Sequence, residues 1–173
     1  MPAAGRHRNA LPHLSRFAWL MGLYGENFQR LSRMFQPQAL PAGTYVSRIP
    51  GGLDLLVEVL EQHPYTVELR LSYRMHDAVT GQPDPSAYVR LYRDARQAEV
   101  THCYVGRHWQ DVLGLRPSVQ AMLSHRLRMN SFLNKWLDYL DGQGHGPHTL
   151  SAIEPEAADE KTWPVLDESA APV

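Results

Sequence analysis

The sequence predicts an α+β domain in which an antiparallel sheet of four to five strands is flanked by an N-terminal and a C-terminal helix. Two observations carry this prediction. Near both ends of the chain, apolar residues recur at steps of three and four, as on one face of a helix. Between these regions they alternate with polar residues, as in half-buried strands. The chain has 173 residues, of which 43% are hydrophobic, and this size and composition fit one domain.

The expected domain covers residues 13–142. Residues 1–12 are interpreted as a mobile arm, and residues 143–173 as a disordered acidic tail, because that stretch is rich in Gly, Pro, Ala and acidic side chains. Residues 150–173 contain six acidic side chains and one Lys, which give this stretch a charge of -5. Because the net charge of the whole chain is -1, the first 149 residues carry about +4. This mild surplus lacks the clustering typical of a nucleic-acid binder.

Several absences predict a cytoplasmic protein outside the membrane. No apolar run approaches the roughly 20 residues that cross a bilayer. The N-terminus has no apolar segment of the kind that a secretory signal requires. A lone cysteine, Cys103, cannot form an internal disulfide, which agrees with a reducing compartment.

A first helix is predicted from His13 to about Phe35, where one apolar stripe runs along the chain and Pro37 follows. The stripe contains Leu14, Phe17, Met21, Tyr24, Phe28, Leu31 and Phe35. The same spacing also fits a coiled-coil seam of a homodimer, but about three heptads are short for that. We therefore favour packing of this helix on the chain's own sheet.

Three strands are predicted next, at Thr44–Ile49, Leu53–Leu60 and Tyr65–Tyr73. The last two show strict alternation and are separated by His63-Pro64, so they are expected to form a hairpin. The segment from His76 to Ser86 contains turn residues and is expected to be a surface loop.

A second hairpin is predicted from Tyr88 to Val100, around a charged turn at residues 94–97. Val89, Leu91, Ala98 and Val100 share the apolar face of this hairpin, and Tyr88, Arg90, Tyr92 and Asp94 share the opposite face.

A second helix is predicted from the N-cap residue Ser118 to Gly142, after a connection at 107–117 with no clear pattern. Its stripe contains Met122, Leu123, Leu127, Leu133, Trp136, Leu137 and Leu140. Asn130 lies near the middle of this stripe, where a buried amide needs partners.

The outward face of the predicted sheet supplies most of the candidate binding residues. One interpretation is a solvated face of cross-strand ion pairs. In the other, Arg70 and Arg90 bind a phosphate or carboxylate group while Tyr88 and Tyr92 provide flat apolar contacts. The full candidate set is Asn27, Arg70, Tyr88, Arg90, Tyr92, Asp94, Arg96 and Asn130.

Four members of this set have alternative roles within the fold. Asp94 and Arg96 fit a local pair that fixes the turn, or Asp94 is a polar partner for a helix. Asn27 and Asn130 fit caps on strand backbone, partners for each other in a buried network, or substrate contacts.

No catalytic, metal or cofactor site is predicted. The sequence contains no phosphate-binding glycine motif, nucleophile elbow or CxxC. His102 and Cys103 point to opposite faces of a strand, so they cannot readily share a metal ion. The leading hypothesis is a non-enzymatic binding or adaptor domain that uses the sheet face or the groove between sheet and helices. The alternative is a sensor or enzyme for a nucleotide-like or other small anion, with Arg70, Arg90 and Arg96 as the clamp.

Three segments together resemble the YqiB-like family of uncharacterised bacterial proteins. They are YGENFQRLSRMF, AYVRLYRDARQAEV and RMNSFLNKWLDYL, beginning at Tyr24, Ala87 and Arg128. This chain departs from the family pattern at Gly25, where an acid is typical, and at His125-Arg126, where an acid and a lysine often stand.

The resemblance covers roughly Leu14 to Gly142 and implies a small cytoplasmic protein, with no established activity, ligand or cofactor. It also implies a gene setting shared with nucleotide-degrading enzymes, such as cyclic-nucleotide phosphodiesterase and ADP-ribose pyrophosphatase. The protein partner and the oligomeric state stay open.

Overall fold

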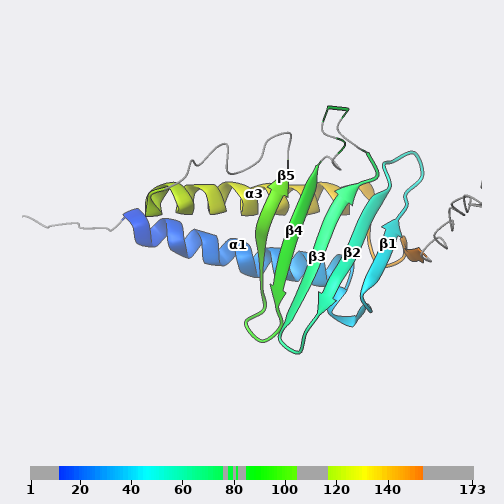
Figure 1. Ribbon diagram of the computed structural model, residues 1–173, viewed down its shortest axis with the longest axis horizontal. Coiled ribbons are helices and arrows are strands. Elements are labelled where there is room, and N and C mark those ends of the chain that lie inside the picture. The colour runs from blue at the N-terminus through cyan, green and yellow to red at the C-terminus, as the bar shows by residue number, and fades with distance from the viewer. Residues whose placement is uncertain (1–11, 76–77, 80, 82–84, 105–116, 154–173) are drawn as a thin grey trace, which may run out of the picture.

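The chain folds as a two-layer α+β structure, as the sequence predicts. The computed structural model describes residues 12–75, 78–79, 81, 85–104 and 117–153. One layer is a six-stranded antiparallel sheet with the order β5-β4-β3-β2-β1-β6. The other layer consists of two long helices that cross the same face of that sheet (Figure 1).

Five of the strands follow one another as neighbours in both sequence and space. They are β1 (Gly43–Ser47), β2 (Leu55–Gln62), β3 (Thr66–Tyr73), β4 (Ser86–Tyr92) and β5 (Gln97–Tyr104). The two predicted hairpins are present as β2–β3 and β4–β5. The 3-10 helix η1 (Pro37–Ala39) connects the first helix to β1. The strand predicted at Thr44–Ile49 ends earlier than expected, because the chain leaves the sheet after Ser47.

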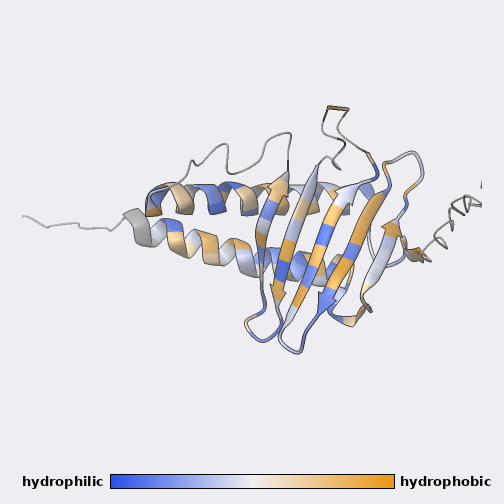
Figure 2. Cartoon of the chain, in the orientation of Figure 1, coloured by the Kyte–Doolittle hydropathy of each residue, from blue (hydrophilic) through white to orange (hydrophobic). Residues whose placement is uncertain are grey.

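The core lies between the sheet and the helices and is built by the alternation that the sequence shows. Val57, Leu69, Val89 and Ala98, one from each of four neighbouring strands, are at most 1% exposed. Apolar and polar bands alternate along each strand because successive side chains point to opposite faces (Figure 2). The opposite face of the sheet therefore carries polar and charged side chains.

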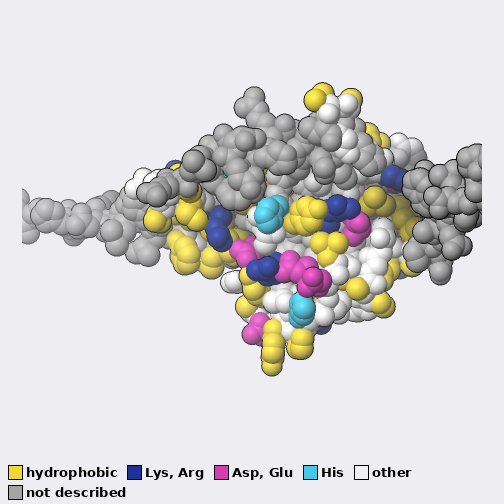
Figure 3. Space-filling model, in the orientation of Figure 1, with side chains coloured by type: hydrophobic (Ala, Val, Ile, Leu, Met, Phe, Trp, Pro, Cys, Tyr) yellow, Lys and Arg dark blue, Asp and Glu magenta, His cyan; other side chains and the backbone are white. Residues whose placement is uncertain are grey.

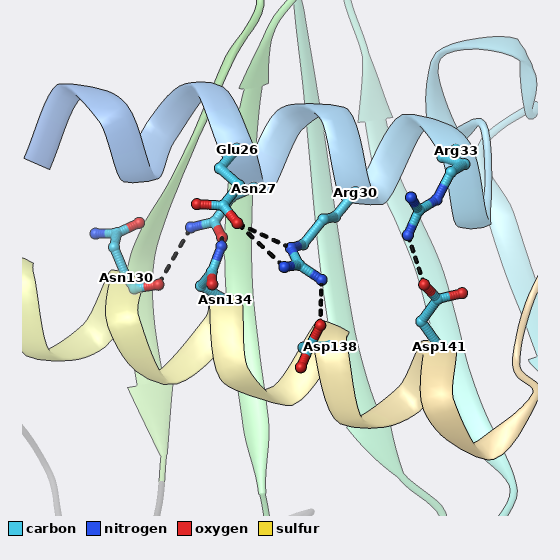
Figure 4. A network of polar contacts seen from close by, with 8 residues as sticks. All are labelled: Glu26, Asn27, Arg30, Arg33, Asn130, Asn134, Asp138 and Asp141. Carbon is cyan, nitrogen blue, oxygen red and sulfur yellow. Dashed lines mark hydrogen bonds and ion pairs between the residues drawn. The ribbon is translucent and has the colours of Figure 1, made fainter.

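The two helices, α1 (Pro12–Met34) and α3 (Val119–Gln143), lie parallel to each other. Contacts between them advance in step along both helices: Asn27 meets Asn134, Arg30 meets Asp138, and Arg33 meets Asp141 (Figure 4). Both N-terminal ends project past β5, the edge strand (Figure 1). Within the described residues, neither helix has the length and apolar content needed to cross a bilayer.

Past the sheet, burial along both helices differs from the predicted stripes. Phe17 and Met122 are 52% and 43% exposed. Leu20 and Leu23, which the stripe did not include, are buried with the predicted Tyr24 and Leu127 in a second small core, and Met21 and Leu123 lie at its margin. The difference arises because, in the described part of the chain, this half of each helix packs against the other helix, so the apolar stripe turns toward that helix.

The sixth strand, β6 (Leu150–Ile153), was assigned by the sequence interpretation to the acidic tail. It pairs with β1, and the domain therefore extends beyond Gly142. Gly144 closes α3 with a φ of 100°, and its amide donates to the carbonyls of Asp141 and Leu140. The following His145 is 3% exposed, and its Nδ1 lies 2.7 Å from Ser47 Oγ on β1. These contacts hold the connection that delivers β6 to the sheet.

Candidate binding site at the β5 edge

The outer face of the sheet is a grid of paired charges. Across the strands, Glu58 lies opposite Arg70, Arg70 opposite Tyr88, and Tyr88 opposite His102. Two residues further along β4, Arg90 lies between Glu68 and Glu99. Arginine and acidic side chains accordingly lie next to one another across this face (Figure 3).

Arg70 is held by two neighbouring residues, Glu58 and Tyr88. Its Nε donates to Glu58, its Nη1 donates to the Tyr88 hydroxyl at 3.2 Å, and its guanidinium lies 5.7 Å from the centre of the Tyr88 ring. The hydrogen bond to Glu58, followed by that to Tyr88, raises the pKa of Arg70. Only 26% of its side chain is exposed, so Arg70 holds the sheet face together.

Arg90 has a matching ion pair but a more open position. Its Nε donates to Glu68, which raises its pKa, and 44% of its side chain is exposed. The two arginines thus form equivalent cross-strand pairs, and Arg90 in addition lines the pocket between β5 and α3.

A polar network continues from Arg90 over the edge of the sheet to the helices. The Tyr92 hydroxyl donates to Glu99 Oε1 at 2.7 Å, and Arg126 Nη1 of α3 donates to Glu99 Oε2 at 3.3 Å. Arg126 is also hydrogen-bonded to Tyr24 of α1, and this bond is the main reason why the pKa of Arg126 is raised. Burial raises the pKa values of Tyr24 and Tyr92. Both oxygens of Glu99 are therefore engaged, and its side chain is only 16% exposed.

The network borders a pocket of about 280 Å³ between β5 and α3. The sheet contributes Arg90 and Glu99 to its lining, and α3 contributes Met122, His125, Arg126 and Met129. Arg126 keeps 49% of its side chain exposed, close to the value for Arg90. The site therefore combines two half-exposed arginine side chains with flexible apolar walls.

His125 adds a neutral ring to this site. Burial lowers its pKa from 6.5, and the charges of Arg128 and Arg126 lower it further. Near pH 7 the imidazole is consequently uncharged and offers one donor and one acceptor.

The structure places Asn27 and Asn130 together but away from the pocket surface. Both are fully buried. Asn27 Nδ2 donates to the Asn130 carbonyl at 3.2 Å, and Asn130 Oδ1 accepts from the Val100 amide on β5 at 3.0 Å. Of the roles left open by the sequence, Asn130 has that of a cap on strand backbone. Asn27 instead joins the two helices, because it donates to the Asn130 main-chain carbonyl and accepts from Asn134 (Figure 4).

The turn residues Asp94 and Arg96 lie at the far end of the β4–β5 hairpin. Asp94 Oδ1 accepts from the Ala95 amide at 2.8 Å, and Arg96 adopts a left-handed backbone conformation with a φ of 53°. Arg96 follows β4 beyond Tyr92, whereas Arg70 lies opposite Tyr88 near its start. The arginines proposed as an anion clamp are therefore spread along the sheet.

Sequence reasoning missed the side chains that complete the site from the helices, namely Tyr24, His125 and Arg126. They come from two helices that lie about a hundred residues apart in the chain, and no local spacing connects them to Glu99. Asn130 was the one sequence feature that pointed to this part of α3, because a polar residue on the apolar stripe needs partners. Its amide lies one helical turn from Arg126 and donates to the Arg126 carbonyl.

A comparison with family models assigns the chain to a known group. The model for a protein of unknown function, DUF1249, matches residues 30–146, about two thirds of the chain. The chain belongs to the DUF1249 family. Arg90, Glu99, His125 and Arg126 lie inside the matched DUF1249 range, and Tyr24 lies before it. No curated protein and no solved structure matches the chain.

Proposed function

We propose that this DUF1249 protein is a non-enzymatic binding domain that holds an anionic group in the pocket between β5 and α3. The observation that carries the proposal is the position of Arg90 and Arg126. One comes from the sheet and the other from a helix, both line one pocket, and each exposes nearly half of its side chain. Guanidinium groups on two rigid elements favour a carboxylate or phosphate as the bound group.

The surroundings of the two arginines support binding in preference to catalysis. Glu99 accepts from Tyr92 and Arg126, so this carboxylate serves to position Arg126. Met122 and Met129 provide adaptable walls for the apolar part of a ligand. Small anionic metabolites and an acidic side chain of a partner protein both fit this description.

The narrower kinship to YqiB-like bacterial proteins and a cytoplasmic location are also part of this proposal. The segments beginning at Tyr24, Ala87 and Arg128 support the kinship, and they contain several residues of the network. The absence of an internal disulfide partner for Cys103 is consistent with a reducing compartment.

The test compares Arg90→Gln with Arg70→Gln, because the two arginines form equivalent ion pairs and only Arg90 lines the pocket. Succinate, glutamate, inorganic phosphate and AMP are screened by thermal shift, and any hit is titrated by calorimetry. A ligand at 100 times its Kd adds about 2.7 kcal/mol of stability. We expect Arg90→Gln to weaken binding of the hit at least tenfold, and Arg70→Gln to leave it within about twofold.

Two results would overturn the proposal. One is a screen in which none of the four anions raises the melting temperature of the wild-type protein. The other is equal weakening by both substitutions, which would place the effect in the sheet face as a whole. Arg126→Gln tests the helix side of the pocket independently.

A further inference from the structure

Acidic side chains are unevenly distributed along the helix pair. Residues 12–25 of α1 and 119–137 of α3 contain no Asp or Glu. Beyond these ranges, Arg30 donates to Glu26 and Asp138, and Arg33 donates to Asp141 (Figure 4). One half of the pair is therefore charge-balanced, and the other half is purely cationic.

The cationic half contains a second groove, which we call the basic groove. Trp19, Leu127 and Phe132 give it apolar lining, and Arg16, Arg128 and Lys135 give it positive charge. Its volume is about 470 Å³, and the Trp19 side chain is 59% exposed. Among the ion pairs of the described residues, none involves these three cations.

The charge and the lining of the basic groove together define the kind of occupant that it fits. Its cations have no acidic residue beside them on residues 12–25 or 119–137 of the two helices, and its walls include an exposed tryptophan. An occupant of the basic groove should therefore combine an apolar anchor with flanking negative charge.

The chain itself contains such a segment after the last described strand. Residues 159–168 read DEKTWPVLDE, in which an apolar run from Trp163 to Leu166 has two acids on either side. The whole stretch 154–173 carries six acids and one Lys, against the surplus of about +4 on residues 1–149. The segment therefore offers an apolar run for the apolar lining of the groove and negative charge for its cations.

The length of this stretch permits the contact within one molecule. It follows Ile153 on β6, at the opposite edge of the sheet from β5. Five inter-strand spacings amount to roughly 24 Å and reach β5, where Asn27 and Asn130 of the helix pair lie. Trp19 stands eight residues before Asn27, about 12 Å further along α1, so the direct span to the groove is roughly 24–36 Å. Trp163 and Leu166 stand ten and thirteen residues after Ile153, which correspond to about 33 and 43 Å of extended chain.

We propose that the basic groove is the docking site for the acidic C-terminal segment of the same molecule, residues 154–173, with the Trp163–Leu166 run against Trp19 and Phe132. Tethering gives the segment a local concentration on the order of millimolar, so a weak site is occupied. The cations make the contact sensitive to salt, because exposed charges are screened over about 8–10 Å.

The test uses the full-length chain labelled with ¹⁵N. At 20 mM NaCl, we expect the amide shifts of residues 159–168 to differ from those of a synthetic 154–173 peptide. They should move to the peptide values at 500 mM NaCl and in Arg128→Glu/Lys135→Glu. The control, Arg74→Glu/Arg96→Glu, changes the net charge equally at exposed cations elsewhere and should leave the shifts in place. Trp163→Ala/Leu166→Ala tests the anchor without changing any described residue.

Three outcomes would overturn the proposal. If the wild-type shifts equal those of the peptide at low salt, the C-terminal segment does not bind the groove. Equal effects of the two charge-reversal variants would reduce the contact to general attraction between tail and body. Shifts that change between 20 and 400 µM protein would place the segment on a second copy. Unchanged far-ultraviolet spectra of all variants exclude loss of the fold as the cause.

Discussion

The side-chain oxygen of Asn130 accepts a hydrogen bond from the backbone amide of Val100, 3.0 Å away, at the point where α3 passes the edge strand β5. An edge strand has backbone groups without a neighbouring strand, and here a helix supplies one of the partners. Asn130 Nδ2 also donates to the Arg126 carbonyl at 2.9 Å. Asn130 thus connects the sheet edge to the helix turn that carries Arg126.

Asn130→Ala should lower the free energy of unfolding by about 1–3 kcal/mol, because it leaves the Val100 amide buried without a partner. Gln143→Ala, on an exposed position of the same helix, is the control and should change stability by less than about 0.5 kcal/mol. Urea denaturation of both variants measures the difference. A loss below 0.5 kcal/mol for Asn130→Ala would contradict the role given to this side chain.

Stability should decrease as the pH falls below about 6.5, and His145 should be one cause. Burial lowers its pKa from 6.5, with Asp54 partly opposing this, so the unfolded chain takes up the proton more readily than the folded one. The contribution of His145 to the free energy of unfolding is complete above its pKa in the unfolded chain, and it is lost as the pH falls through its lower pKa in the folded protein. Urea denaturation at pH 7.5, 6.5 and 5.5 should show a decline in the wild type.

His145→Asn is the matching variant for this pH effect. It should be less stable at pH 7.5, because the contact with Ser47 changes, and its stability should depend less on pH. His125, whose pKa is also lowered, accounts for part of the remaining slope, which His125→Gln should reduce. A wild-type pH profile that His145→Asn leaves unchanged would count against this assignment.

Two glycines should respond oppositely to alanine. Gly22 lies within α1, and beyond its chain neighbours and the backbone of its own helix no described atom lies within 4 Å of where a Cβ would stand. Gly22→Ala should therefore stabilise the protein by roughly 0.5–1 kcal/mol. Gly144 has a φ of 100°, so Gly144→Ala should be destabilising. Melting temperatures and urea midpoints measure both changes. A shift in the same direction for both variants would contradict the backbone argument.

The buried contact between Tyr73 and Trp136 should be cooperative. The Trp136 indole donates to the Tyr73 hydroxyl at 3.1 Å, and the rings meet edge to face with centroids 5.4 Å apart. Tyr73→Phe should cost about 1–2 kcal/mol by leaving the indole N–H unpaired. In a double-mutant cycle with Trp136→Phe, we expect a coupling energy of about 0.5–1.5 kcal/mol. Additive losses would show that the two side chains contribute independently.

Periodicity predicted most of the fold because the pattern of burial is local. The alternation in Leu53–Leu60 and Tyr65–Tyr73 places Val57 and Leu69 in the core, and Asn130 lies on the buried stripe as expected. The strand Leu150–Ile153 was missed because four residues after a Gly/Pro-rich segment carry little periodicity, and its pairing with β1 is non-local. His145 was placed in a tail for the same reason.

The candidate site was predicted only on its sheet side. Arg90 and Tyr92 were identified from the alternation of one strand. Tyr92 donates to Glu99, and Arg90 joins the network through its hydrogen bond with Tyr92. Arg126 and Tyr24 meet that network because two helices run parallel at a fixed offset, and no local sequence pattern encodes such an offset. Arg70 and Arg90 both lie on the polar face of a strand, so alternation alone could not distinguish them. In the structure Arg70 is enclosed by Glu58 and Tyr88, whereas Arg90 lines a pocket.

The parallel course of α1 and α3 has a consequence during synthesis of the chain. Asn27 and Asn134 are separated by 107 residues, so α1 leaves the ribosome long before its helical partner exists. All five strands from β1 to β5 are made in the interval. Contacts at such separations form slowly, and an apolar helix face that waits for its partner invites aggregation or chaperone binding. Nascent chains arrested before residue 119 should therefore expose Leu20, Leu23 and Tyr24, which pack with Leu127, and release of α3 should bury them.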